Sequence, residues 1–148
     1  MRIKEVDAKD VPDDLLLIAD PSEQNIYSYK SSAWCFCAIV ESTIAGVAVI
    51  KRICPSTAEL FNISVFPEFQ QQGIGSRILQ ASLEAVKERG VNRVVLGTGT
   101  FGHQLTFYQR NGFRVDSVLK NYFLENYSDP IEENGIQHKD MLRLYVDL

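Results

Sequence analysis

Apolar and polar residues change their spacing several times along the chain, and the clearest change lies between residues 59 and 90. Residues 59–67 hold an alternating apolar run that ends at Pro67, and a short polar loop with two glycines follows. Apolar residues then recur at the spacing of one helix face, at Ile74, Ile78, Leu79, Leu83 and Val86. This stretch predicts a strand, a loop and a long helix, which ends at the glycine C-cap Gly90 after a cationic last turn.

The rest of the chain also divides into strand and helix patterns. Continuous apolar runs at 34–40 and 44–53 predict a β-hairpin whose strands are buried on both faces. Pro12 stands where a first helix can start, and Thr100 is a candidate N-cap for a helix through residues 101–111. The remaining predicted elements are a strand at 1–6, a short helix at 22–31, and strands at 57–65, 93–96, 113–119 and 142–146.

Length and composition indicate one compact α/β domain over residues 1–148. The chain is 45% apolar and 23% charged, which is ordinary for a globular protein that buries a core. A net charge of −4 and an isoelectric point near 5.2 argue against a nucleic-acid binder and favour a basic or amine partner. We find neither a signal-peptide pattern nor the roughly 20 apolar residues of a membrane helix, so we expect a cytoplasmic protein without a membrane partner.

The three cysteines do not form a recognisable site. Cys35, Cys37 and Cys54 have no metal-binding spacing, and an odd number does not suit a disulfide framework. All three lie in predicted strands or at their ends. We therefore expect buried or half-buried strand residues and no metal site.

The loop before the long helix has the chemistry of an anion site. The first N–H groups of a helix have no partner within the helix, the helix dipole is positive there, and glycine lets a phosphate approach the backbone. We therefore predict a phosphate cradle around residues 71–76. A P-loop would need Gly-Lys-Ser/Thr where this chain has Gly75-Ser76-Arg77, and a dinucleotide fingerprint would need a third glycine in place of Ile78.

Two segments resemble the motifs of the GCN5-related N-acetyltransferases, the GNAT family. Residues 65–75, VFPEFQQQGIG, resemble the family's acetyl-coenzyme A motif, and residues 107–114, FYQRNGFR, resemble its second motif, a tyrosine followed by Gly-Phe. The two motifs stand in the family's order and at its usual separation. The chain departs from the family in residues 97–104, where many relatives carry an asparagine toward the cofactor and this chain has Gly99 and Phe101.

The resemblance implies a fold and an activity. The fold would be α/β (α+β), a single-domain GNAT-like fold with a mixed, mostly antiparallel sheet of about six to seven strands flanked by about four helices. The activity would be an N-acetyltransferase that moves the acetyl group of acetyl-CoA directly to a primary amine of unknown identity. The alternative is an acyl-CoA-binding sensor or interaction module without turnover. In this family the acceptor, a small molecule or a peptide amine, is selected by residues 20–32 and 119–138, and a homodimer is expected by analogy.

The resemblance also implies roles for individual residues. The strand with Ile63 and Val65 would pair with the pantetheine arm of acetyl-CoA and meet the thioester oxygen. Tyr108 matches the tyrosine that can protonate the coenzyme sulfur. The residues that would bind the pyrophosphate, mainly through main-chain N–H groups, are Gln70, Gln71, Gln72, Gly73, Gly75 and Ser76.

Amine acetylation also needs a proton acceptor, because an alkyl ammonium has a pKa near 10 and must lose a proton before it attacks. Glu59, at the start of the central strand, is the preferred base. His138, Asp140 and Glu125 are its rivals, because the C-terminal region usually walls the acceptor site in this family. His103 and His138 are isolated in the sequence, and each is more simply a surface histidine or one with satisfied hydrogen bonds. The acidic turn with Asp129, Glu132 and Glu133 is more simply a solvated loop, although it could attract a cationic acceptor.

Overall fold

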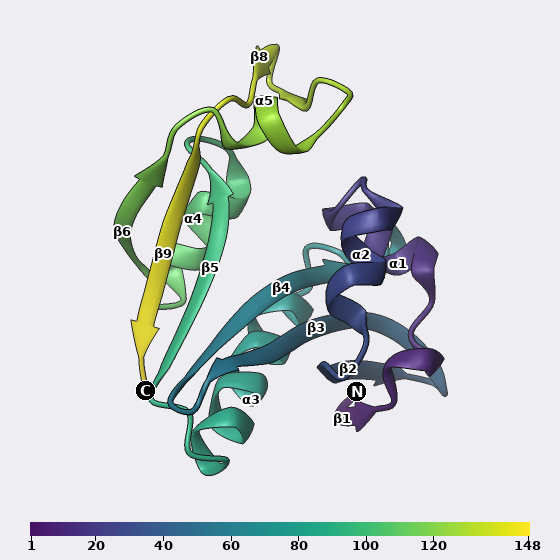
Figure 1. Ribbon diagram of the computed structural model, residues 1–148. Helices are drawn as coiled ribbons and strands as arrows, with labels where there is room; N and C mark the ends of the chain where they lie inside the picture. The colour runs from purple at the N-terminus through teal and green to yellow at the C-terminus, as the bar shows by residue number, and fades with distance from the viewer. The chain divides into compact units, whose positions relative to one another are not determined.

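The chain forms two compact units in the computed structural model, which describes all 148 residues (Figure 1). The first unit comprises Met1–Val94 with Leu148, and the second comprises Val95–Asp147. The main sheet has seven strands, divided between the two units, which agrees with the predicted fold class. None of the helices is long and apolar enough to cross a membrane. The assignment of residues 1–148 to one domain stays a prediction.

The first unit holds the N-terminal strands and the long helix. Neighbouring strands run antiparallel in the order β1-β2-β3-β4, which confirms the predicted antiparallel first half. Single 3-10 turns occur at Ala8–Asp10 and Pro67–Phe69. The other elements are β1 (Arg2–Val6), α1 (Asp13–Ala19), α2 (Glu23–Lys30), β2 (Trp34–Val40), β3 (Thr43–Cys54), β4 (Thr57–Val65) and α3 (Ile74–Glu88).

Helices cover both faces of this four-stranded layer. On one face α1 and α2 pack against alternate residues of β2 and β3, among them Cys37 and Val47. On the other face α3 lies so close that a β-carbon at Gly46 would press on Ile78. Gly46 and Val47 are adjacent in β3 and therefore point to opposite faces. The predicted apolar stripe of α3 is its buried face: Ile74, Ile78, Leu79, Leu83 and Val86.

A β-bulge in β4 changes which residues share a face. Val49 of β3 pairs with Asn62, but the next residue, Ile50, pairs with Leu60. Phe61 is therefore an extra residue in β4. The bulge reverses the inside-outside alternation, so residues before it cannot be assigned to a face by counting back from residues after it.

The second unit contains most of β5 (Arg93–Gly99). The strands follow the order β5-β9-β6, with β6 antiparallel to β9, and β7 and β8 form a separate two-stranded hairpin. In Figure 1, α5 and this hairpin form an excursion between β6 and β9, which we define as residues 120–140. The elements after β5 are α4 (His103–Arg110), β6 (Arg114–Leu119), α5 (Tyr122–Asn126), β7 (Glu132–Glu133), β8 (Ile136–Gln137) and β9 (Met141–Asp147).

The structure corrects several local predictions in this unit. The N-cap of α4 is Gly102, with φ +106°, and Thr100 lies before it. β5 extends to Gly99, three residues beyond the predicted end. The short helix α5 was not predicted, so the chain has five α-helices where about four were expected.

The cysteines differ in their surroundings. Cys35 and Cys37 in β2 are buried as predicted, and burial raises the pKa of their thiols to about 11 and about 12. Cys54, at the end of β3, is exposed, which corrects the expectation of a buried or half-buried residue. Hydrogen bonding with the side chain of Thr57 is the main reason that the pKa of the Cys54 thiol lies below its ordinary value.

Candidate active site

The loop between β4 and α3 is anchored by its own side chains. The side-chain amide of Gln70 donates to the carbonyl of Val65 at 2.9 Å, and that of Gln72 donates to the carbonyl of Glu68 at 3.4 Å. Gln71 has φ +62°, in the left-handed region that few residues with a β-carbon adopt. The backbone therefore follows a defined, strongly curved path into the helix.

Gly73 is the N-cap of α3, and no side chain caps this helix. Its φ of +77° is left-handed, while a β-carbon there would meet no atom within 4 Å, so the backbone conformation favours glycine and the space above it is open. The N–H of Arg77 donates to the carbonyl of Gly73 at 3.2 Å and closes the first helical turn. The uncapped positive end of α3 thus faces an open space, an arrangement that can hold an anion.

β4 leads directly into this loop and carries the residues predicted to line the pantetheine arm. Ile63 and Val65 are half-buried, whereas Asn62 and Ser64, which alternate with them along the strand, are buried. The bulge at Phe61 interrupts the hydrogen-bond ladder, and such an interruption is common beside active sites. Phe61 is left out of the β3–β4 pairing, whereas Ile63 stays paired with Ala48.

A buried polar network joins β4 to α1 and α2. The side-chain amide of Asn62 donates to the carbonyl of Leu16 at 2.9 Å and to the hydroxyl of Tyr29 at 3.0 Å. Tyr29 donates in turn to Asp20 at 3.2 Å, and Ser64 donates to the side-chain oxygen of Asn62 at 2.6 Å. Because buried polar groups need partners, this network fixes how the two helices sit on the strand.

Glu59 lies in β4 on the other side of the bulge from Ile63. It is half-buried and pairs with Lys51 of β3. Val49 of β3 packs in the cluster under α1 and α2, and Lys51, two residues later, points to the same face. Directly opposite residues of paired strands share a face. Glu59 therefore lies on the side covered by α1 and α2. Its role as the base is not decided by this position.

Tyr108 lies in the second turn of α4, in the second unit, with only 6% of its surface exposed. Its ring packs edge-on against Phe107 and Phe113, with centroids 5.5 and 6.0 Å away. Burial raises the pKa of the phenol well above its ordinary value, so the hydroxyl keeps its proton at neutral pH. Tyr108 is therefore a hydrogen-bond donor at neutral pH.

The three rival bases also lie in the second unit. Glu125 is exposed on α5, and the carboxylate of Asp140 accepts a hydrogen bond from the main-chain N–H of Asn121 at 2.8 Å. His138 is buried, and its Nε2 lies 2.9 Å from Oε1 of Glu133. Of the three, His138 alone combines burial with a carboxylate partner.

Glu133 is a candidate that the sequence analysis missed. Its carboxylate also lies 3.4 Å from both Nδ1 and the main-chain N–H of His103, at the start of α4. Hydrogen bonding with His138 is the main reason that the pKa of the Glu133 carboxyl lies below its ordinary value. An overlooked signal was the sequence Asn134-Gly135, whose positive φ angles of +55° and +76° form the two-residue hairpin turn beside Glu133.

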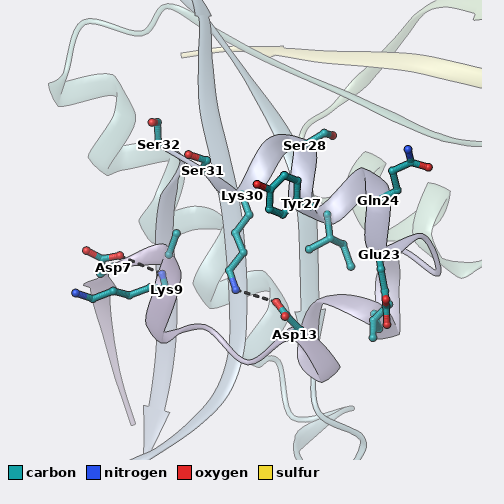
Figure 2. A pocket seen from close by; sticks show the side chains of 13 residues that line it. Asp7, Lys9, Asp13, Glu23, Gln24, Tyr27, Ser28, Lys30, Ser31 and Ser32 are labelled. Atoms are coloured by element: carbon teal, nitrogen blue, oxygen red, sulfur yellow. Dashed lines mark hydrogen bonds and ion pairs between the residues drawn. The ribbon is translucent and has the colours of Figure 1, made fainter.

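A cavity of about 1150 Å³ lies in the first unit, between the first 3-10 turn, α1 and α2 (Figure 2). An ion pair between Lys30 and Asp13, 2.8 Å long, crosses it, and Tyr27 and Glu23 stand on its rim. None of the predicted catalytic or acetyl-CoA-binding residues lines it. It overlaps residues 20–32, the segment that the resemblance associates with acceptor selection.

Comparison with known proteins decides the family. Residues 31–115 match the family model of the acetyltransferase (GNAT) domain. The chain is also 40% identical over 136 residues to the uncharacterized N-acetyltransferase YvbK of Bacillus subtilis, which covers 91% of this chain and 88% of that protein. The chain belongs to the GNAT family.

Solved GNAT structures share its fold. A GNAT family acetyltransferase from Elizabethkingia anophelis with acetyl-CoA bound has a TM-score of 0.94 and 38% identity, covering 99% of this chain and 97% of that chain. A Bacillus subtilis acetyltransferase in complex with CoA has a TM-score of 0.91 and 38% identity, covering 99% and 98%. This GNAT protein is an N-acetyltransferase with acetyl-CoA as its donor, and the alternative of a sensor without turnover fits less well.

Proposed function

We propose that this GNAT protein transfers the acetyl group directly from bound acetyl-CoA to a primary amine. The observation that carries the proposal is the start of α3, where a left-handed glycine, the absence of a capping side chain and the anchored loop leave main-chain N–H groups for an anion. The residues that would hold the pyrophosphate there are Gln70, Gln71, Gln72, Gly73, Gly75 and Ser76.

The other donor contacts come from β4 and α4. Acetyl-CoA supplies the thioester, and the main chain at Ile63 and Val65, beside the bulge, would pair with its pantetheine arm. A main-chain N–H there would stabilise the oxyanion that forms when the amine attacks. Tyr108, which keeps its proton because it is buried, would donate to the departing thiolate.

The proton acceptor lies in one of two places in this proposal. The first is Glu59 in β4, half-buried opposite Lys51. The second is the excursion of the second unit, which holds His138, Asp140 and Glu125. A carboxylate or a histidine can perform this step, since each can accept the proton that an ammonium must lose.

The acceptor that we propose is a cationic small molecule or peptide amine. The net charge of −4 supports a cationic partner and speaks against nucleic acid. We place the reaction in the cytoplasm and away from the membrane. The homodimer expected from the family stays a prediction.

Calorimetric titration of acetyl-CoA, followed by a free-thiol release assay over a panel of primary amines, tests this function. We expect saturable binding, thiol release with at least one amine, and a fall of about 100-fold in kcat for Tyr108→Phe with acetyl-CoA binding unchanged. Gly73→Glu should abolish binding, because it places a carboxylate in the cradle. Gly90→Glu is the matched control, since Gly90 lies at the other end of α3 with φ +90° and equally open space.

Two results would contradict the proposal. Equal losses of acetyl-CoA affinity in Gly73→Glu and Gly90→Glu would mean that backbone strain, and not the cradle, decides binding. Tight binding without thiol release for any amine, at any pH up to about 10, would favour the sensor alternative, because alkyl amines are then substantially neutral.

A further inference from the structure

The second unit holds a cluster of ionisable and aromatic residues that neither sequence motif includes. Its ionisable members are His103 at the start of α4, Glu133 in β7 and His138 after β8. They form one group because the carboxylate of Glu133 contacts both histidines. We call this group the Glu133 cluster.

The hydrogen bond to Glu133 assigns the tautomer of His138. The Glu133 carboxyl has a depressed pKa and is ionised at neutral pH, so it can only accept hydrogen bonds. Nε2 of His138, 2.9 Å from Oε1, therefore carries the proton and donates it to this bond. Nδ1 of the neutral ring is then left with a free lone pair.

Nδ1 of His138 is buried and has no hydrogen-bond partner, and it is the only buried side-chain nitrogen or oxygen in the chain of which this is true. A buried polar atom without a partner is rare and often marks a functional site or a bound water. Nδ1 of His138 is thus the atom of the Glu133 cluster that is left to accept a proton.

Neighbouring residues hold the imidazole of His138 in this position. A β-carbon at residue 99 would overlap the imidazole of His138, so the chain needs glycine at that position to admit the ring. Phe101 stacks on the ring with centroids 4.0 Å apart, and Phe123 of α5 lies 5.7 Å away. The imidazole is therefore fixed by β5, α5 and Glu133 together.

We propose that His138, oriented by Glu133, is the proton acceptor of the acetyl transfer, and that it takes the proton from the acceptor ammonium through one ordered water at Nδ1. An N–H bond of the ammonium breaks, an Nδ1–H bond forms, and the nitrogen lone pair is freed to attack. Glu133 stabilises the imidazolium in the manner of the carboxylate in a catalytic triad. Tyr108 gives its proton to the departing thiolate and is reprotonated by the amine's second proton, and His138 returns its proton to solvent.

This inference rests on the proposed function and chooses between its two places for the base. Glu133 of β7 is the ionisable group bonded to the ring, and His103 of α4 contacts that same carboxylate. Lys139 and Asp140 follow His138 in the chain. α5 and β5 contribute Phe123 and Gly99 at the ring, neither of which ionises. The pH dependence of kcat/KM in variants of Glu133 and His138 can therefore be compared with that of a His103 variant.

The decisive experiment is the pH dependence of kcat/KM for a primary amine in the wild type and in His138→Gln, Glu133→Gln and His103→Gln. We expect His138→Gln to lose about 100-fold near pH 7 and to recover to within about threefold at pH 10, where the amine deprotonates without help. Glu133→Gln should lower kcat/KM near pH 7 by about 10-fold and keep the recovery at pH 10, because the imidazolium loses its charged partner. His103→Gln should lose much less than His138→Gln near pH 7, since the His103 side chain is 85% exposed and its contact with Glu133 is the longer one, at 3.4 Å.

Other outcomes would overturn the inference. A loss in His138→Gln that persists at pH 10 would indicate a structural role, and a pH-rescued loss in Glu59→Gln with a wild-type profile in His138→Gln would make Glu59 the base. If His138→Gln does not fold, an unchanged kcat/KM near pH 7 in Glu133→Gln overturns the proposal by itself. Nitrogen-proton NMR of the histidine rings needs no turnover: a His138 that carries its proton on Nδ1 would refute the inference even if the proposed acetyl transfer fails.

Discussion

At the scale of single residues, the three thiols show how strongly surroundings decide chemistry. Cys35 and Cys37 have raised pKa values because they are buried in β2, whereas Cys54 is exposed and has a lowered pKa. The reactive form of a cysteine is the thiolate. Only Cys54 combines accessibility with an increased thiolate fraction.

We predict that one thiol of the folded protein reacts quickly with Ellman's reagent and that the other two react only on unfolding. Absorbance during reaction at pH 7.5, with and without denaturant, measures both phases. Cys54→Ser should remove the fast phase alone. A fast phase of two or more thiols per chain would contradict the buried state of Cys35 and Cys37. The same variant removes the background from any thiol-release assay of acetyl transfer.

Individual site residues could be predicted only where a local motif names them. Gln70 to Ser76 and Tyr108 stand in two recognisable motifs. The partner of His138 could not be found in this way, because Glu133 comes into contact with His138 only when β7 and β8 pair as a hairpin. The face on which Glu59 lies depends on the bulge at Phe61, which the sequence does not mark.

At the scale of elements, α1 and α2 are fixed to β4 by the buried network around Asn62. The amide of Asn62 is the donor for both Leu16 and Tyr29, so its loss leaves two buried acceptors without this partner. An exposed counterpart exists in α5, where the amide of Asn126 donates to the carbonyl of Tyr122 at 2.8 Å. The two asparagines make similar bonds in different surroundings.

We predict that Asn62→Ala lowers the free energy of unfolding by about 2 to 3 kcal/mol, because buried polar groups lose their partner. Asn126→Ala should change it by no more than about 0.5 kcal/mol, because water replaces the lost bond. Urea denaturation followed by circular dichroism measures both. Similar losses in the two variants would show that burial of the network contributes nothing to stability.

Elements were predicted well where their signal is local. The apolar stripe of α3 and the continuous runs of β2 and β3 gave their bounds closely, because both patterns reflect burial directly. The start of α4 was misplaced because Thr100 has the side chain of an N-cap, while the observed cap, Gly102, lies against the carboxylate of Glu133. A contact between residues 31 positions apart has no local signature.

At the scale of the whole molecule, the donor should act as a stabilising ligand. A ligand at 100 times its dissociation constant adds about 2.7 kcal/mol if it binds only the folded chain. For a chain of this size, we predict that this raises Tm by roughly 5 to 10 °C. Differential scanning fluorimetry with acetyl-CoA measures the shift, and Gly90→Glu should retain it. A shift of the same size in Gly73→Glu would place the anion site elsewhere.

The loop that precedes α3 has a consequence for the speed of the catalytic cycle. Its path is defined by contacts within the chain itself: Gln71 and Gly73 have left-handed φ angles, and the side-chain amides of Gln70 and Gln72 donate to main-chain carbonyls. A preformed site loses little conformational entropy when it is filled, and association does not have to wait for a segment to fold. If the loop holds the pyrophosphate as we propose, the exchange of CoA for acetyl-CoA would be limited by the strength of its contacts and not by the folding of a segment.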